Sequence, residues 1–486
     1  MSSTTDPSNL ARIFKAYDVR GLVPDQLDED LARAVGAAFV AVTEATATGV
    51  VVGHDMRPSS PGMARAFAEG AASAGADVTL IGLASTDELY FASGRLGLPG
   101  AMFTASHNPS QYNGIKMCRA NAVPIGMDTG LARIRDLVPD VAPPAARSSD
   151  IREADVLPDY AAHLRSLAPV RGRRLKVVVD AGNGMAGHTA PTVLAGLDLD
   201  VVPMYFELDG TFPNHEANPL DPANLVDLQA AVREHGADLG LAFDGDADRC
   251  FVVDADGEPV SPSAVTGLVA VREIERARAG GDTSVSIVHN VITSAAVREI
   301  VLEAGATPVR TRVGHSFIKA EMARAGAVFG GEHSAHYYFR DFWFADTGML
   351  AAMHVLAALG EQDAPLSELC AQYERYVASG EINSTVTDQA AVVDQVRAWA
   401  QVRGATTDVL DGLTVSSPEG QTPMWWFNVR ASNTEPLLRL NVEAADRETM
   451  QDVRDELLSL IRSGADAAHA PDEGGSTPAQ DAGDAS

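Results

Sequence analysis

Short apolar runs that end in polar or glycine-rich loops alternate with helical patterns in the first part of the chain. The predicted strands are residues 13–21, 49–53, 78–81 and 100–103, and the predicted helices are residues 27–42 and 60–74. Strands that alternate with helices in this way imply βαβ units and a mainly parallel sheet.

The same pattern recurs twice, and a different one follows it. The later predicted strands are residues 175–179, 239–243, 284–288, 307–313 and 327–330. After these, helices near residues 389–403 and 447–460 flank strands at 424–429 and 437–442, which is an α+β pattern. We therefore expect the fold class α/β, with three similar mixed-sheet α/β domains and a smaller α+β C-terminal domain.

The predicted domains are residues 1–150, 151–255, 256–372 and 373–463, followed by a tail at 464–486. A Pro/Ala-rich stretch at residues 139–146 is typical of a linker at the end of the first domain. After Ser463 the chain has no Lys or Arg and is rich in Gly, Ala, Asp and Pro, so we expect a disordered acidic tail.

Composition narrows the class of protein. The chain has 486 residues, too many for one core, and its apolar runs are too interrupted for a membrane span. The first residues lack the basic and apolar regions of an export signal, and Cys118, Cys250 and Cys370 are odd in number and widely spaced. We therefore expect a cytoplasmic protein with reduced thiols. A net charge of −29 argues against nucleic acid and membranes as partners.

A hydroxyl nucleophile follows one predicted strand. Residues 104–109 read Thr-Ala-Ser-His-Asn-Pro, and Ser106 would lie at the carboxyl edge of the sheet, where open α/β sheets hold their active sites. An Asn-Gly pair at 113–114 predicts a turn that brings Lys116 back towards Ser106. His107 is adjacent to Ser106 and is not spaced for a Ser-His-Asp triad. Taken alone, this stretch is also typical of an ordinary turn.

Asp244, Asp246 and Asp248 alternate along the loop after another apolar strand, and Arg249 closes this loop. Three carboxylates would repel one another without a counter-charge, and oxygen ligands with room for a phosphate oxygen and water suit Mg²⁺. The spacing is not that of an EF-hand. A solvated acidic turn is the weaker alternative, because the preceding strand is wholly apolar.

Two more loops carry polar groups. Glu332, Ser334 and His336 follow the strand at 327–330, and the carboxylate and hydroxyl could bind sugar hydroxyl groups. For His336, a buried structural histidine is an equally good interpretation. The last predicted strands of the C-terminal domain and the loop between them carry cationic, hydroxyl and amide side chains that could bind a phosphate ion. These are Arg430, Ser432, Asn433, Thr434 and Arg439.

Near the N-terminus, Tyr17 and Arg20 could reach an anion, although a structural ion pair is the plainer role for Arg20. Together with the four motifs above, this segment resembles the α-D-phosphohexomutase family, in particular bacterial phosphomannomutase/phosphoglucomutase enzymes. The resemblance runs from Tyr17 to Arg439. It implies three similar α/β domains and a smaller fourth domain around a central cleft. His333 and Ala335 depart from the family pattern, which leaves the sugar open.

The resemblance also implies roles for individual residues. Ser106 would be the phosphoserine, and its phosphate would bind Mg²⁺ together with Asp244, Asp246 and Asp248. Glu332 and Ser334 would bind the sugar. The phosphate that is not transferred would be held by Arg430, Ser432, Asn433 and Thr434. The remaining predicted substrate-binding residues are Tyr17, His107, Arg249, His336 and Arg439.

The implied reaction is reversible phosphoryl transfer between the 1- and 6-positions of a hexose phosphate. It would pass through the phosphoserine and a bisphosphorylated sugar, with hexose 1,6-bisphosphate as activator. Arg20, Lys116 and Arg249 would spread the developing charge. Lys116, Arg20 and His315 are the candidates for proton transfer. If Glu332 and Ser334 bind the 3- and 4-hydroxyls, both mannose and glucose phosphates would be accepted.

Several alternatives stay open. A phosphoglucosamine mutase or a strict phosphoglucomutase would share these motifs, although Asn433 favours the mannose/glucose branch. A Mg²⁺-dependent sugar phosphatase would need the aspartate loop but neither Glu332 nor the C-terminal anion loop. A non-catalytic sugar-phosphate-binding protein would tolerate loss of Ser106, which the chain retains. The protein could be a monomer or a dimer.

Overall fold

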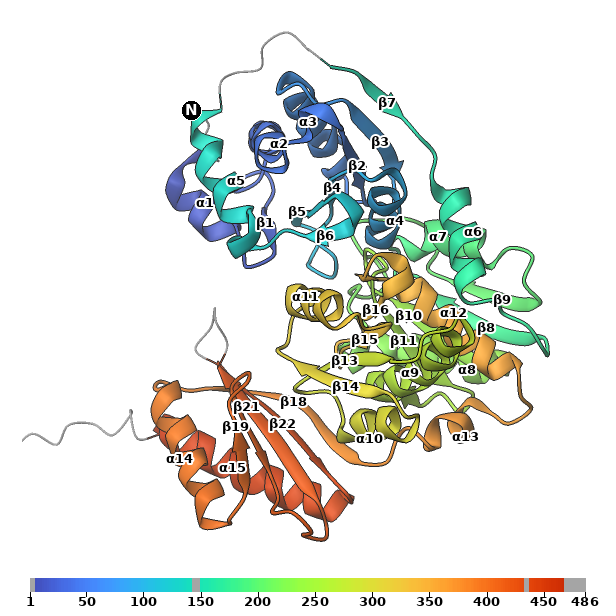
Figure 1. Cartoon of the computed structure of the whole chain (residues 1–486), viewed down its shortest axis with the longest axis vertical. Coiled ribbons are helices and arrows are strands. Elements are labelled where there is room, and N and C mark those ends of the chain that lie inside the picture. The colour runs from blue at the N-terminus through green and yellow to red at the C-terminus, as the bar shows by residue number, and fades with distance from the viewer. Residues whose placement is uncertain (1–4, 142–148, 432–436, 467–486) are drawn as a thin grey trace, which may run out of the picture. The chain divides into compact units, whose positions relative to one another are not determined.

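The computed structural model describes residues 5–141, 149–431 and 437–466. The chain divides into two compact units, Met1–Arg375 and Tyr376–Ser486. Among the described residues, the first unit holds three β-sheets and the second holds one (Figure 1). No helix in these described ranges is long and apolar enough to cross a membrane.

The first sheet is mixed, with the order β1-β5-β4-β2-β3-β7 and β6 beside β5. Its strands are β1 Asp18–Leu22, β2 Val50–His54, β3 Val78–Leu83, β4 Gly100–Phe103, β5 Tyr112–Arg119, β6 Val123–Pro124 and β7 Ile151–Glu153. The run from β4 through β2 and β3 to β7 is parallel, whereas β5 is antiparallel to both β1 and β4. The prediction of a mainly parallel sheet thus holds for β4, β2, β3 and β7, whereas β5 pairs in antiparallel fashion with its neighbours.

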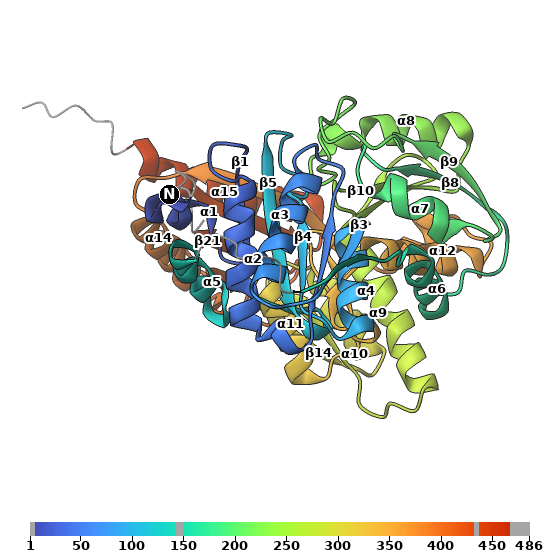
Figure 2. The same ribbon diagram turned by 90° about the horizontal axis from the view of Figure 1, so that it is seen from above.

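Helices of this part are α1 Pro7–Ile13, α2 Glu29–Thr43, α3 Ser60–Ser73, α4 Thr86–Leu96 and α5 Leu131–Leu137, with short 3-10 turns at Ala45–Ala47, Ala120–Ala122, Met127–Thr129 and Val138–Asp140. Helices α2 and α3 pack side by side (Figure 2). Between them and the sheet lie the rings of Phe39, Phe67 and Phe103, with successive ring centroids 5.6 Å apart. Phe103 is the last residue of β4, and Ser106 lies in the loop that follows, at the carboxyl ends of the parallel strands.

Two local predictions in this region are wrong. Residues 13–21 do not form one strand, because α1 ends at Ile13 and β1 begins only at Asp18. The helix forms because Asp6 caps it, accepting a 2.9 Å hydrogen bond from the Ser8 amide, and Pro7 occupies its first turn.

The Asn-Gly pair at 113–114 lies inside β5 and not in a turn. Asn113 pairs with Gly21 and its side-chain amide donates to the hydroxyls of Ser59 and Ser60. At Gly114 a Cβ would lie 2.5 Å from a β1 carbonyl oxygen, so the close approach of the two strands requires glycine there. Tertiary contacts therefore override the local turn preference, and Lys116 returns towards Ser106 on a strand.

The second and third sheets repeat the mixed arrangement, with the orders β12-β11-β10-β8-β9 and β14-β13-β15-β16-β17. Their strands are β8 Leu175–Asp180, β9 Leu199–Met204, β10 Leu239–Phe243, β11 Cys250–Asp254, β12 Pro259–Val260, β13 Ser286–Asn290, β14 Thr307–Thr311, β15 Phe329–Gly331, β16 Tyr337–Phe339 and β17 Ala345–Asp346. Their helices are α6 Leu157–Leu167, α7 Ala186–Leu194, α8 Val226–His235, α9 Pro262–Ala279, α10 Ala295–Glu303, α11 His315–Ala325, α12 Gly348–Gly360 and α13 Leu366–Ala371, with a 3-10 turn at Pro222–Leu225 and another at Arg340–Phe342. One continuous hydrophobic core joins the two sheets, which explains why they belong to one unit.

In each of the three sheets, a buried strand turns back into an antiparallel neighbour through a polar loop. The pairs are β4 with β5, β10 with β11 and β15 with β16. The three loops carry Ser106, Asp244 and Glu332 respectively. The shared arrangement explains the recurring sequence pattern of an apolar strand followed by reactive side chains.

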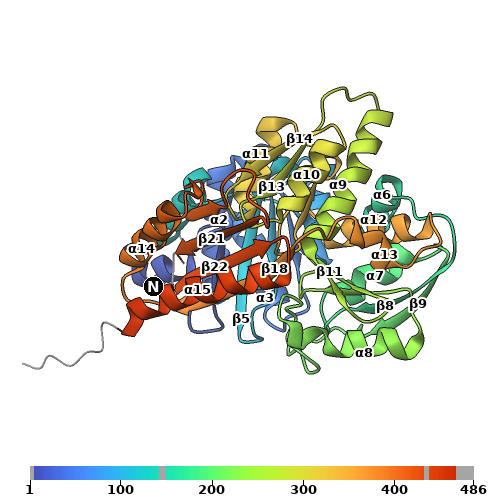
Figure 3. The same cartoon turned by 90° about the horizontal axis from the view of Figure 1, so that it is seen from below.

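The second unit is an antiparallel sheet with the order β18-β22-β21-β20-β19. Its elements are β18 Val377–Thr385, α14 Gln389–Val402, β19 Thr406–Asp408, β20 Leu413–Ser416, β21 Trp425–Ala431, β22 Leu437–Ala444 and α15 Arg447–Asp466. Helices α14 and α15 cover one face of the sheet (Figure 3). Trp425 belongs to the hydrophobic core between these helices and the sheet. Residues 464–466 continue α15, so the predicted tail starts too early, and residues 467–486 lie outside the described part.

Candidate active site

Ser106 lies in the loop after the wholly buried strand β4, and its hydroxyl points towards the acidic loop of the second sheet. Its Oγ donates a 2.8 Å hydrogen bond to Oδ2 of Asp244 and lies 3.1 Å from Nδ1 of His107. The adjacent imidazole thus reaches the hydroxyl, which sequence spacing did not suggest. The arrangement is not a Ser-His-Asp triad, because the carboxylate contacts the hydroxyl, whereas a triad carboxylate holds the imidazole.

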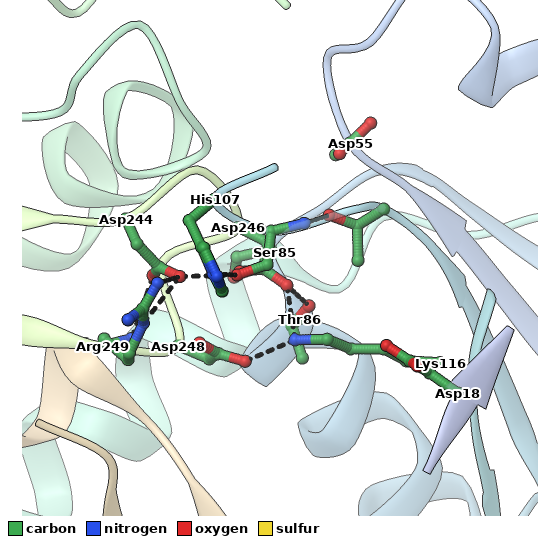
Figure 4. Close-up of polar contacts among 12 residues, drawn as sticks. Asp18, Asp55, Ser85, Thr86, His107, Lys116, Asp244, Asp246, Asp248 and Arg249 are labelled. Carbon is green, nitrogen blue, oxygen red and sulfur yellow. Dashed lines mark hydrogen bonds and ion pairs between the residues drawn. The ribbon is translucent and has the colours of Figure 1, made fainter. Parts of the chain in front are cut away.

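The three aspartates of the acidic loop converge as predicted from their spacing. One carboxylate oxygen each from Asp244, Asp246 and Asp248 lies within 4.8 Å of those of the other two, and all three side chains are buried. Lys116 lies 2.7 Å from Asp246 and 2.6 Å from Asp248, while Arg249 lies 3.0 Å from Asp244 (Figure 4). Two cations, Lys116 inside β5 and Arg249 just before β11, therefore face three carboxylates.

Burial and these ion pairs shift the protonation of the cluster in opposite directions. Burial raises the pKa of Asp244 to about 7, although Arg249 opposes the shift. Burial acts on Asp246 as well, but Lys116 outweighs it and lowers the pKa of Asp246 below its ordinary value. Burial also disfavours the charged form of Lys116, yet Asp246 and then Asp248 raise its pKa well above the ordinary value. When all three carboxylates are ionised, they exceed the two cations by one negative charge, which a bound cation would balance.

The donor atoms of the cluster fit a hard divalent cation. Among the described residues, Oδ1 of Asp246 and Oδ1 of Asp248 are buried and accept no hydrogen bond. Buried carboxylate oxygens that accept no hydrogen bond are costly, and Mg²⁺ prefers carboxylate ligands. The acidic cluster can therefore hold a metal ion.

The loop after β15 brings the predicted sugar-binding residues to the same place. Glu332 accepts hydrogen bonds from the Gly314 amide at 3.1 Å and the Ser334 hydroxyl at 3.1 Å. His336 lies 3.4 Å from Glu332 and 3.7 Å from Oδ1 of Asp248, so it connects the two loops. Burial opposes ionisation of Glu332, but His336 lowers the pKa of Glu332 to about 2, so the carboxylate can accept hydrogen bonds at neutral pH.

His315 begins α11 beside this loop. Its ring meets that of His336 edge-to-face with centroids 4.7 Å apart, and its Nδ1 lies 3.5 Å from Asp346. Tyr17 also packs against this imidazole, with its ring centroid 6.1 Å from that of His315. Tyr17, Lys116 and His315 line one small pocket.

Arg20 is held on β1 by two partners. It donates to Oδ1 of Asn108 and, at 2.5 Å, to Oδ2 of Asp18. Arg20 thus contacts the Ser106 loop through Asn108. Arg20 therefore forms the structural ion pair that the sequence suggested, with Asp18, and also lies beside the Ser106 loop.

Sequence reasoning missed several side chains at this site. Lys319 on α11 lies 2.7 Å from Asp346 and 4.0 Å from the ring centroid of Tyr90. Lys319 stands four residues after His315, one helical turn further along α11, and Asp346 ends a strand. The spacing of Lys319 from His315 and the position of Asp346 at a strand end are sequence features that could have indicated these two residues.

Thr86 and Arg57 were also missed. Thr86 starts α4 and donates a 2.6 Å hydrogen bond to Oδ2 of Asp246. Arg57 follows β2, and its guanidinium is buried against the Ser106 loop. Their location after strands of the first sheet, at the edge where Ser106 lies, was the available signal.

In the second unit, Arg430 and Arg439 stand opposite each other on β21 and β22. Both face Glu381, at 3.6 Å and 3.2 Å, and Arg430 also lies 3.7 Å from Asp411. The other predicted members of this phosphate-binding loop, Ser432, Asn433 and Thr434, lie outside the described residues.

Comparisons with known proteins identify the family of the chain. Sequence models of the phosphoglucomutase/phosphomannomutase family match almost the whole chain: alpha/beta/alpha domain I at residues 11–142, domain II at 158–257, domain III at 262–376 and the C-terminal domain at 381–460. The fold and the site thus define a class of multidomain phosphosugar mutases, and the chain belongs to the phosphoglucomutase/phosphomannomutase family.

Individual members of this family are similar to the chain over nearly its whole length. The chain is 40% identical over 465 residues to a phosphomannomutase from Escherichia coli, covering 92% of this chain and 99% of that protein. It is 35% identical over 461 residues to the phosphomannomutase/phosphoglucomutase of Pseudomonas aeruginosa, covering 93% and 96%. A crystal structure of a phosphoglucomutase/phosphomannomutase family protein from Burkholderia thailandensis superimposes with a TM-score of 0.83 at 31% identity, covering 96% and 98%.

Proposed function

We propose that the chain is a phosphomannomutase/phosphoglucomutase, which moves a phosphoryl group reversibly between the 1- and 6-positions of mannose or glucose phosphate. One observation carries the assignment of the site. The Ser106 hydroxyl donates to Asp244, a member of a buried carboxylate cluster that also contacts Lys116 and Arg249. A nucleophile, a cation site and two fixed positive charges are what phosphoryl transfer requires.

In this proposal Ser106 carries the phosphoryl group and passes it to one end of the sugar. Lys116 and Arg249 spread the negative charge that develops on the transferred group. Asp244, Asp246 and Asp248 would hold Mg²⁺, which when bound neutralises phosphate charge and orients the phosphate oxygens. His107 beside the hydroxyl is neutral, because burial, with Arg249 next, lowers the pKa of His107 to about 2.

The sugar end would be held by Glu332 and Ser334, whose oxygens can accept hydrogen bonds from two hydroxyl groups. After the first transfer, the bisphosphorylated sugar must present its other end to Ser106 while meeting the same acceptors. Among the three candidates for proton transfer, Lys116 is paired with two carboxylates that keep it charged, and a guanidinium such as that of Arg20 is normally a poor proton-transfer group. The geometry favours His315, whose ring packs against that of His336 and lines one pocket with Lys116 and Tyr17.

Other parts of the proposal extend beyond the site. We infer that hexose 1,6-bisphosphate activates the enzyme by phosphorylating Ser106, and that the partners are small hexose phosphates in the cytoplasm. Arg430, Arg439 and the loop at 432–434 would hold the phosphate that is not transferred. The oligomeric state, monomer or dimer, would follow from light scattering.

The deciding experiment measures initial rates with the 1-phosphates of mannose, glucose and glucosamine, each with its bisphosphate. Peptide mass spectrometry of the untreated enzyme and Ser106→Ala as a control accompany these rates. We expect phosphate on Ser106, turnover of mannose and glucose phosphates, and a nearly inactive variant. Preference for glucosamine phosphate would move the protein to that branch. Release of inorganic phosphate as the main product would indicate a phosphatase.

A further inference from the structure

Arg57 makes an unusual set of contacts beside the proposed nucleophile. Its guanidinium donates to main-chain carbonyl oxygens of the loop after β4 and of the first residue of β5: Ser106 at 2.9 Å, Asn108 at 2.6 Å, Pro109 at 3.0 Å and Tyr112 at 3.0 Å. The donors of a guanidinium are fixed in one plane, so these carbonyls are held relative to one another. The side chain thus acts on the shape of the loop through its main chain.

Asp55 fixes the guanidinium in turn. Oδ2 of Asp55 lies 3.2 Å from Nε of Arg57, and Oδ1 accepts hydrogen bonds from the Arg57 amide at 3.0 Å and the Ser60 hydroxyl at 2.5 Å. Neither charged side chain is exposed to solvent. A buried ion pair of this kind contributes little to net stability, so its value lies in the geometry it imposes.

The loop needs such support at Ser106. A φ of 49° is strained for a residue with a Cβ, and strained backbone persists only where the surroundings hold it. The Ser106 amide donates to the Thr104 hydroxyl at 3.0 Å, and Arg57 holds the carbonyl on the other side. A Cβ on Gly245 of the acidic loop would lie 2.4 Å from the same carbonyl oxygen, so the two loops meet there closely.

The segment that follows β9 also contacts Arg57. The ring centroid of Phe212 lies 5.1 Å from Cζ of Arg57. A Cβ on Gly210 would lie 2.7 Å from Cα of Arg57, which shows close backbone packing. Arg57 therefore lies between the Ser106 loop and a segment connected to the second sheet.

We propose that Arg57 is a positioning residue for phosphoryl transfer: by holding the carbonyls of residues 106–112, it keeps Ser106 Oγ directed at Asp244. The inference rests on the proposed role of Ser106 as phosphoserine. Misplacing a reacting group by about 1 Å can cost about 100-fold in rate, so a small loosening of the loop would be measurable.

The test compares Arg57→Lys with Arg165→Lys. Arg165 on α6 is a matched control, because it also donates to main-chain carbonyls, those of Thr192 and Val193, away from Ser106. For Arg57→Lys we expect about 100-fold slower phosphoryl transfer from phosphorylated Ser106 in single turnovers, with KM changed less than about threefold. The ³¹P resonance of the Ser106 phosphate should shift or broaden, and Arg165→Lys should alter none of these quantities.

A folded Arg57→Lys enzyme with the wild-type rate and resonance would overturn the inference. If that variant does not fold, Asp55→Asn provides the same test, since it releases the guanidinium, and we expect the rate to fall about tenfold. A wild-type rate for Asp55→Asn would again contradict us. Ser106→Ala separates the two proposals: an active Ser106→Ala enzyme refutes the phosphoserine, whereas an inactive one beside an unaffected Arg57→Lys refutes only the role of Arg57.

Discussion

The hydroxyl of Ser106 donates a 2.8 Å hydrogen bond to Asp244, which lies 138 positions further along the chain. The contact joins the loop after β4 of the first sheet to the loop after β10 of the second. Each loop alone has ordinary composition, but together they present a hydroxyl to a buried carboxylate cluster.

Asp246→Asn should reduce Mg²⁺-dependent turnover at least about 100-fold, because one hard ligand and one negative charge are lost. The variant should stay folded, since an amide of the same shape can still accept from Thr86. Steady-state rates over a Mg²⁺ titration, with circular dichroism, measure both effects. Asp254→Asn is the control, because Asp254 is also buried at a strand end of the second sheet but accepts from backbone amides. Wild-type turnover by Asp246→Asn would contradict the metal assignment.

Lys116→Met should destabilise the metal-free protein, because it leaves Asp246 and Asp248 buried without their cation. Loss of one partner from a buried pair typically costs about 3–5 kcal/mol. Saturating Mg²⁺ should restore more of the melting temperature in the variant than in the wild type, since the ion replaces the missing positive charge. Thermal denaturation with and without Mg²⁺ measures this difference. An equal Mg²⁺ effect in both proteins would show that the ion binds elsewhere.

Arg430→Ala should weaken binding of glucose 1-phosphate by roughly tenfold or more while leaving free glucose little affected, since a charge-assisted contact to phosphate is lost. Titration calorimetry with the two ligands gives the comparison. Arg454→Ala is the control, because Arg454 pairs only with its neighbour Asp455 on α15 among the contacts observed in the described residues. Equal weakening for both ligands would argue against a phosphate site.

Glu88→Gln should change how stability depends on pH. Glu88 is buried in the first turn of α4, where its carboxylate accepts from the Ser85 amide. Burial, followed by repulsion from Asp87, raises the pKa of Glu88 from 4.5 to about 8. A carboxyl with a raised folded-state pKa stabilises the fold most at low pH, and this contribution is lost as pH rises from about 4.5 to 8.

The uncharged glutamine should therefore make the variant more stable than the wild type at pH 8, by up to about 4 kcal/mol, with little difference near pH 4.5. Melting temperatures across this range measure the effect. Glu368→Gln, at an exposed first-turn position of α13, should show no such crossover. Parallel curves for Glu88→Gln and the wild type would refute the assignment of a raised pKa.

Much of the fold could be predicted because a buried strand is visible as an apolar run, and the residue types of the following loop reveal its chemistry. Ser106, the three aspartates and Glu332 were predicted in this way, and the structure brings their loops together. Local patterns failed at residues 13–21, where a capped helix forms, and at the Asn-Gly pair of β5. In the latter case, close contact with β1 outweighs the turn preference.

The sequence by itself thus determined most of the strands, the loops and the kinds of side chain that they carry. Only the tertiary structure decided which side chains meet. Lys116 and Asp246 pair across 130 positions, and Arg57 reaches the Ser106 carbonyl across 49. Such contacts depend on how the sheets pack around a shared core, and an arginine that binds carbonyl oxygens has no local pattern that separates it from one in a surface ion pair.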